Sequence, residues 1–191
     1  ALLNIQYTSG TTGMPKGCMQ SQRFWLVLGC TVAAMEPDIN SILADHPFFY
    51  IDPQWMVVFA LKSGACYYLA KRMSSSRFLD WVTEHPIEFC YFPKPLLNMD
   101  PDPREQQHSL KKCTIGAVSR GTLKEGEERL GVSIRQNYGM TEIGAGLMVP
   151  DDATDDAIFD TCGLPTPFRR LRIVDQQGND VPDGEPGELI V

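Results

Sequence analysis

Strand-like and helix-like segments alternate through most of this chain, and that alternation limits the possible folds more than any other feature. Apolar runs are separated by stretches with apolar residues at helical spacing, and the connections are short. Strands joined through helices pair in parallel, which predicts an α/β fold with a mostly parallel, layered sheet. The expected strands are 42–50, 65–70 (buried), 87–92, 113–118 and 132–136, and the expected helices are 21–35, 55–61, 74–85 and 123–130.

Single residues mark where several of these helices begin and end. Ser21 is expected to cap the first helix, because its hydroxyl can accept a hydrogen bond from the first turn. Gly64 and Gly131 are expected to end the second and fourth helices, since glycine adopts the left-handed conformation of a C-cap. Residues 18–20 are predicted to be a short link before the first helix.

The pattern changes after residue 149. An acidic loop with five aspartates covers 151–160, and two turn sequences, 177–179 and 182–184, separate strand-like residues 171–175 and 188–191. We therefore expect a central α/β core over residues 1–149 and the start of a small antiparallel β subdomain over residues 150–191.

Residues 7–17 read Tyr-Thr-Ser-Gly-Thr-Thr-Gly-Met-Pro-Lys-Gly and follow the apolar run 1–5. Glycines let the backbone approach an anion, hydroxyl groups add hydrogen-bond donors, and Lys16 adds a positive charge. The composition is typical of a phosphate-binding loop, although the spacing is not that of a Walker loop. A Ser/Thr/Gly connector without a ligand has a similar composition, so both interpretations stay open at this point.

A second motif, residues 136–142, reads Gln-Asn-Tyr-Gly-Met-Thr-Glu and follows a predicted strand. The hydroxyl of Thr141 beside the carboxylate of Glu142 suits a phosphate together with Mg²⁺, which prefers oxygen ligands and shares them with phosphates. An ordinary turn followed by a helix cap is the alternative. Ligands gather at the carboxyl ends of the strands in a parallel sheet, so we expect both motif loops there.

The two motifs, in this order, resemble the signatures of the adenylate-forming (AMP-binding) superfamily, which contains acyl-CoA synthetases, peptide-synthetase adenylation domains and luciferases. The resemblance extends over nearly the whole chain and implies the central part of that family's large N-terminal domain. The N-terminal portion, the ribose-binding aspartate and the C-terminal domain with its lysine are then expected outside the chain. The 191 residues alone are expected to be inactive and to expose unpaired sheet edges.

The resemblance also implies a nucleotide site. Tyr138 matches the residue that lies against adenine, and Thr141 matches one that contacts the α-phosphate. Val118 stands where the family has a proline in its adenine wall. The residues expected to bind the nucleotide are Thr8, Ser9, Gly10, Thr11, Thr12, Lys16, Gly116, Ala117, Val118, Asn137, Tyr138, Gly139, Met140 and Thr141.

Further roles follow from the same resemblance. Lys16, Thr141 and Glu142 are the expected catalytic residues, and Glu142 with Thr8 is expected to bind Mg²⁺. Tyr50 lies in the aromatic run 47–52, at a position where many acyl-CoA synthetases have histidine, and is expected to line the acid pocket. His46, His85 and His108 are scattered along the chain, which favours structural or surface roles.

The implied reaction joins a small-molecule carboxylic acid to ATP, giving an acyl-adenylate, and then forms a thioester with CoA. ATP, Mg²⁺ and CoA are the implied cofactors and co-substrates of an acid–thiol ligase. Such chemistry depends on positioning and charge neutralisation more than on a protein base. An adenylation domain of a peptide synthetase and a nucleotide-binding module without catalysis are the two alternatives.

The net charge and the cysteine spacing indicate which binding partners and which compartment the sequence favours. The net charge of −7 argues against non-specific binding to nucleic acid or an anionic membrane. The sequence has no apolar run long enough to cross a bilayer. Six cysteines without paired spacing favour free thiols in a reducing compartment, and hence a cytoplasmic location. The sequence leaves open whether the protein forms a homo-oligomer.

Overall fold

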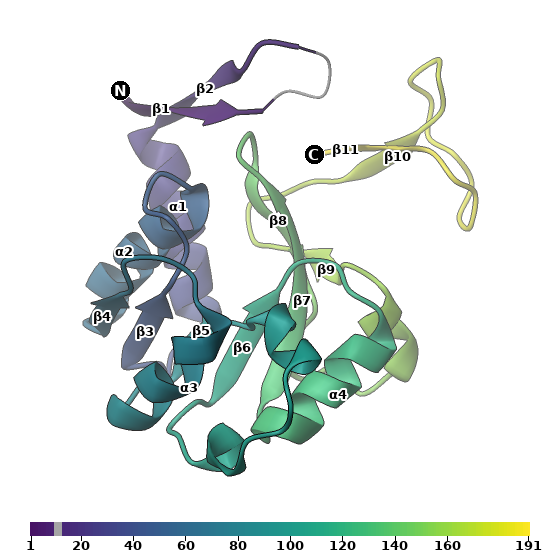
Figure 1. Cartoon of the computed structure of the whole chain (residues 1–191). Helices are drawn as coiled ribbons and strands as arrows, with labels where there is room; N and C mark the ends of the chain where they lie inside the picture. Colours follow the sequence, from purple (N-terminus) through teal and green to yellow (C-terminus); the bar gives the residue numbers. More distant parts are fainter. Residues whose placement is uncertain (10–12) are drawn as a thin grey trace.

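The computed structural model describes residues 1–9 and 13–191, and in them a seven-stranded sheet forms the centre of the molecule (Figure 1). Its strand order is β4-β3-β5-β6-β7-β8-β9. The first five of these strands pair in parallel and the last two are antiparallel, which confirms the predicted α/β fold. The strands are β3 (Ser41–Ala44), β4 (Cys66–Leu69), β5 (Phe89–Tyr91), β6 (Lys112–Ile115), β7 (Ser133–Met140), β8 (Gly144–Met148) and β9 (Leu164–Pro165).

Four helices, α1 (Gln22–Met35), α2 (Ile51–Ser63), α3 (Ser75–Glu84) and α4 (Arg120–Leu130), connect the strands. Ser21 caps α1 as predicted, because its Oγ accepts a hydrogen bond from the Phe24 backbone N–H at 3.2 Å. Gly64 and Gly131 end α2 and α4 with φ angles of 68° and 67°, as predicted. Three short 3-10 helices, η1 (Lys94–Asn98), η2 (Pro103–Gln106) and η3 (Asp156–Asp160), lie in the connections.

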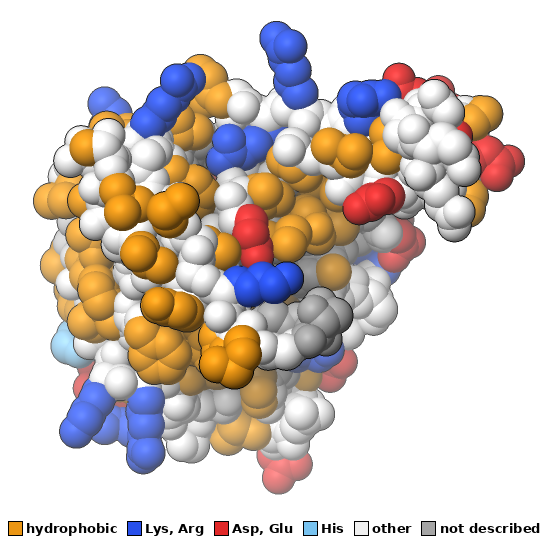
Figure 2. Space-filling view, turned by 90° about the horizontal axis from the view of Figure 1, so that it is seen from above, with side chains coloured by type: hydrophobic (Ala, Val, Ile, Leu, Met, Phe, Trp, Pro, Cys, Tyr) orange, Lys and Arg blue, Asp and Glu red, His pale blue; other side chains and the backbone are white. Residues whose placement is uncertain are grey.

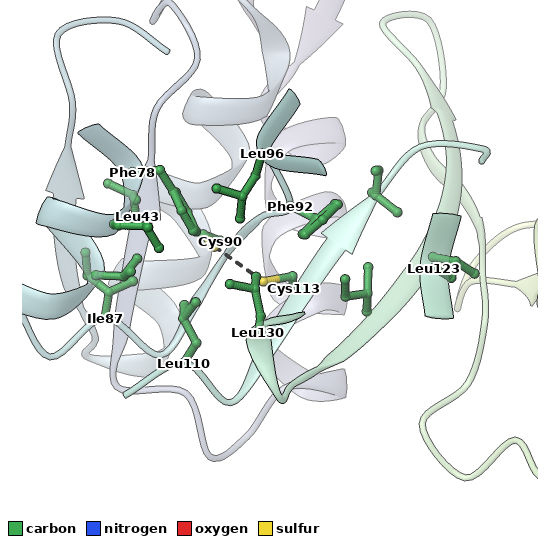
Figure 3. Packing of buried hydrophobic residues seen from close by; sticks show 14 of the residues in the cluster. Leu43, Phe78, Ile87, Cys90, Phe92, Leu96, Leu110, Cys113, Leu123 and Leu130 are labelled. Carbon is green, nitrogen blue, oxygen red and sulfur yellow. Dashed lines mark hydrogen bonds between the residues drawn. The ribbon is translucent and has the colours of Figure 1, made fainter. Parts of the chain in front are cut away.

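The sheet is buried on both faces by two hydrophobic cores. Successive residues of a strand point to opposite faces, and in β3 Ile42 belongs to one core and Leu43 to the other. Helices α1 and α2 pack on the Ile42 side. Helices α3 and α4 pack on the Leu43 side, where the Sγ atoms of Cys90 and Cys113 lie 3.5 Å apart (Figure 3). The packed sheet is therefore rigid, and it holds the residues at the carboxyl ends of its strands in fixed positions.

Strands β1 (Leu2–Thr8) and β2 (Lys16–Ser21) form a separate antiparallel hairpin, at the top of Figure 1. The prediction of a link over residues 18–20 was wrong, because these residues pair with β1. The first motif therefore joins the two strands of a hairpin and does not follow a strand of the parallel sheet. Only the second motif, which extends β7, lies where both were expected.

Other boundaries also differ from the predictions. Residues 65–70 are not a buried strand, since β4 is the edge of the sheet and Leu69 is 53% exposed. The strand expected over 42–50 ends at Ala44, and a turn follows in which the Tyr50 N–H donates to the Pro47 carbonyl. The C-terminal pair β10 (Arg172–Val174) and β11 (Glu188–Ile190) is antiparallel, as predicted. None of the helices in the described ranges has the length and apolar character needed to span a membrane.

Candidate functional site

A cavity of about 670 Å³ opens where the carboxyl ends of β3, β5 and β6 meet the hairpin and the β7–β8 turn. It lies where ligands usually bind in parallel sheets. The residues that line it come from segments far apart in the sequence, and they include Gln6, Leu28, His46, Tyr91, Gly116 and Thr141.

Two glycines shape the second motif. Strand β7 continues to Met140 and pairs with β8, so residues 137–140 are strand and not the expected loop. A Cβ atom at Gly139 would lie 2.6 Å from the Gly144 carbonyl oxygen, and Gly144 itself has a φ of 69°. These glycines permit the tight turn over residues 141–143, which carries Thr141 and Glu142.

The β1–β2 hairpin presents polar side chains on its inner face. Asn4 pairs with Gln20, Gln6 with Cys18 and Thr8 with Lys16, so these six side chains share one face of the hairpin. The alternate residues Leu3, Ile5, Tyr7 and Met19 face the other way and are 48–77% exposed. Figure 2 looks down on this end of the molecule and shows hydrophobic side chains over much of its surface. The inner face carries the first motif's lysine.

The two motifs meet at this inner face. Gln20 Nε2 donates a hydrogen bond of 2.6 Å to the Thr141 carbonyl oxygen. Cys18 lies close enough to Thr8 and Glu142 for both side chains to influence the pKa of its thiol. Partial burial raises the pKa of the Cys18 thiol, and the negative charge of Glu142 raises it further. Thr8 and Glu142 therefore lie near the same thiol, and Lys16 shares the inner face with Thr8 as its cross-strand partner.

The donor set at this meeting point fits Mg²⁺ bound through phosphate. Thr8 and Glu142 both influence the pKa of Cys18, so a hydroxyl group and a carboxylate lie near the same thiol. Within residues 1–9 and 13–191, no group of three or more His, Cys, Asp or Glu side chains could hold a metal by itself. Mg²⁺ is commonly held by one or two carboxylates together with substrate phosphates and water, which matches this arrangement.

The turn at residues 116–118 is held by a buried glutamine. The Val118 N–H donates to Gln136 Oε1 at 2.7 Å, and Gln136 Nε2 donates to the Phe159 carbonyl at 2.6 Å. Gly116, Ala117 and Val118 all line the cavity. The supporting role of Gln136 could not be predicted from the sequence, since a glutamine at a strand end gives no pattern that identifies its partners.

At the other end of the cavity lies a polar cluster that the sequence analysis also missed. Asp45 Oδ1 and His46 Nδ1 are 2.9 Å apart, and the Tyr91 hydroxyl donates to Asp52 Oδ1 at 2.7 Å. The hydrogen bond to Asp45 raises the pKa of His46, and burial raises that of Tyr91 well above its usual value. These residues come from the segment after β3, the first turn of α2 and the last position of β5, and no local sequence pattern joins them.

The predicted site residues fall into three groups. Gly10, Thr11 and Thr12 lie outside the described residues. Thr8, Ser9, Lys16, Tyr138 and Glu142 are described but are not part of the cavity wall, and Thr8 and Glu142 meet at its hairpin side. The predicted residues that line the cavity are Tyr50, Gly116, Ala117, Val118, Asn137, Gly139, Met140 and Thr141.

Comparisons with known proteins identify the family and the fold of the chain. The family model described as AMP-binding enzyme matches residues 1–191. The chain is 33% identical over 201 residues to an indoleacetate–CoA ligase of Aromatoleum aromaticum, covering 99% of this chain and 39% of that protein. It is 28% identical to a feruloyl-CoA synthase of an Amycolatopsis species, covering 98% of this chain and 40% of that protein.

Among solved structures, the O-succinylbenzoate coenzyme A synthetase of Bacillus subtilis, in complex with AMP, superposes with a TM-score of 0.83 at 23% identity. The match covers 99% of this chain and 40% of that chain, and it shows that the fold is shared. The chain thus spans about 40% of the length of the relatives described here.

Proposed function

The chain belongs to the AMP-binding enzyme family, and on that premise we propose that the protein carrying it activates a carboxylic acid with ATP. The proposed products are an acyl-adenylate and pyrophosphate, and the acyl group then passes to the thiol of CoA. One observation carries the proposal: the hairpin with Thr8 and Lys16 meets the turn with Thr141 and Glu142 beside a single cavity.

In this proposal the hairpin end of the cavity holds the phosphates. Lys16 neutralises phosphate charge, and the hydroxyl groups of Thr8, Ser9 and Thr141 donate hydrogen bonds to phosphate oxygens. Gly10, Thr11 and Thr12 complete the loop by resemblance to the family. Mg²⁺, when bound, supplies positive charge that offsets the charge developing on the phosphates. Glu142 and Thr8 are the residues that would hold it.

The opposite end of the cavity is proposed to hold the base and the acid. Residues 116–118 form one wall for the adenine, with Asn137, Gly139 and Met140 nearby and Tyr138 on the same strand. Tyr50 lies in the acid pocket, whose wall also includes Trp55 and Tyr91. Residues 1–149 would then carry both motifs and the cavity, and residues 150–191 would begin an antiparallel subdomain.

The test is acid-dependent exchange of pyrophosphate into ATP, measured on the full-length protein that carries this chain. A panel of carboxylic acids is compared with an acid-free control, and thioester formation is then measured with CoA and with a carrier protein. Exchange with at least one acid, followed by acyl-CoA formation, is the expected result. Binding of ATP without exchange for any acid would instead favour a non-catalytic nucleotide-binding module. Transfer only to the carrier protein would favour a peptide-synthetase type of adenylation domain.

A further inference from the structure

Two amide side chains stand opposite each other on the inner face of the hairpin and extend in different directions. Asn4 and Gln20 are cross-strand partners, so their side chains leave the hairpin on the same face. Gln20 is 2% exposed. Asn4 is also partly buried. An unmade hydrogen bond costs free energy at a buried polar side chain, so the partners that each amide does have indicate what it holds in place.

Gln20 links the hairpin to the second motif. Its Nε2 donates to the Thr141 carbonyl oxygen at 2.6 Å, and Glu142 is the next residue in the chain. Its Oε1 is buried and has no hydrogen-bond partner among the described residues. Reversing the amide would set two carbonyl oxygens against each other, so the donor orientation is fixed by Thr141. The same bond therefore fixes the hairpin relative to the turn.

Asn4 links the hairpin to the acid end of the cavity. Its Oδ1 accepts from Trp25 Nε1 at 2.9 Å, and its Nδ2 donates to Gln54 Oε1 at 3.1 Å. Gln54 Nε2 in turn donates to the Phe48 carbonyl at 2.9 Å, at the start of the segment that carries Tyr50. This chain of hydrogen bonds runs from the hairpin through the first turn of α2 to the wall of the cavity.

We propose that Asn4 and Gln20 are positioning residues that lock the hairpin to the two ends of the cavity, Gln20 to the phosphate end and Asn4, through Gln54, to the acid end. The proposal rests on the proposed function only in taking ATP and the acid as the ligands at the two ends of the cavity. Neither amide is assigned a contact with ATP or acid. Gln20 holds the Thr141 backbone carbonyl, and Asn4 acts through Gln54, which holds the Phe48 carbonyl. The hairpin, Thr141 and the 48–50 segment thereby keep one relative placement.

Replacing Gln20 by Met tests the phosphate-end link in the full-length protein, because Met has a similar length and lacks the N–H donor. Loss of one buried hydrogen bond should raise the Kd for Mg-ATP about fivefold, with the KM for the acid changed by less than about twofold. Gln54→Met should do the reverse, raising the KM for the acid and leaving the Kd for Mg-ATP nearly constant. Gln22→Met, at an exposed position with no side-chain hydrogen bond in the described residues, is the matched control.

Calorimetric titration with Mg-ATP gives a readout that does not depend on turnover, and melting temperature separates positioning from general destabilisation. Gln20→Leu, which is uncharged and also lacks the donor, replaces Gln20→Met should that variant not fold. The proposal is supported when Gln20→Met raises mainly the Kd for Mg-ATP and Gln54→Met raises mainly the KM for the acid. Equal changes in both constants, or no change in either in folded variants, overturn it. Should no acid support exchange, the proposed function fails, and the titration of Gln20→Met against Gln22→Met still decides the role of Gln20.

Discussion

The hairpin and the seven-stranded sheet are built in opposite ways. The sheet has apolar side chains on both faces, and Ile42 in β3, Phe59 in α2 and Phe78 in α3 are fully buried between the sheet and its helices. In the hairpin, the polar residues face inward and apolar residues such as Met19 face outward. Burial of apolar surface is not directional, whereas hydrogen bonds are. The sheet is therefore suited to give stability, and the hairpin to place charged and hydroxyl groups at one point.

The largest effect that tests this division is in the core. Phe78→Ala removes a fully buried ring from the cluster under α3, and it should lower the free energy of unfolding by about 3–5 kcal/mol. Urea unfolding measures the change. Phe168→Ala, at a site 79% exposed, should change it by less than about 0.5 kcal/mol. A tenfold weaker affinity for Mg-ATP in folded Phe78→Ala protein would show that core and hairpin are not independent.

The second largest effect is expected from a substitution in the hairpin, and it concerns the rate of catalysis. Lys16→Ala removes the lysine that the hairpin register places beside Thr8, and it should cost about 3 kcal/mol in the transition state, roughly a hundredfold in exchange rate. Because Lys16 is exposed, the free energy of unfolding should stay nearly constant. Lys62→Ala, also exposed and in the last turn of α2, is the control. Equal exchange rates for Lys16→Ala and wild type would remove Lys16 from the mechanism.

The sheet could largely be predicted from the sequence because its signals are local. The glycines that end helices and the Ser21 cap act within a few residues, and they appear in the structure where expected. Residues 65–70 were predicted to be buried because they are apolar. Which strand lies at a sheet edge depends on strand order, however, and no local pattern encodes that order.

The candidate site was predictable only where a motif marks it. Thr141 and residues 116–118 were identified by resemblance, and they line the cavity. The hairpin alternates apolar and polar residues, which indicates a strand but not which face points inward. The usual assumption, apolar side inward, would have turned Lys16 away from Glu142. The Asp45–His46 pair and Gln136 were missed because their partners come from distant elements.

A smaller, pH-dependent effect is expected at the cavity wall, where the sheet ends in a polar cluster. The hydrogen bond to Asp45, aided by the charges of Asp45 and Asp52, raises the pKa of His46 above its ordinary value of 6.5. A raised pKa in the folded state means that protonated His46 stabilises the fold below the unfolded pKa, and that this contribution is lost as the pH rises through the folded pKa.

The destabilisation caused by His46→Gln should therefore be larger at acidic than at alkaline pH. Urea unfolding of wild type and variant at both ends of this range measures the difference. The exposed His85, substituted in the same way, provides the control. A His46→Gln effect that does not change with pH would mean that the Asp45–His46 contact is not an ion pair in solution.

The smallest effect on stability is expected on the outer face of the hairpin, where exposed apolar side chains lie opposite the polar inner face. Met19 is 77% exposed, and Met19→Thr keeps a residue that favours strands, so the free energy of unfolding should change by less than about 0.5 kcal/mol. The same substitution should reduce self-association of the 191-residue chain, because it shortens a row of exposed apolar side chains that includes Ile5 and Tyr7. Unfolding and light scattering measure the two quantities. A loss of more than about 1 kcal/mol would mean that this face is buried in solution. The hairpin would then owe its position to apolar packing as well, and Gln20 and Asn4 would hold it less than the inner hydrogen bonds indicate.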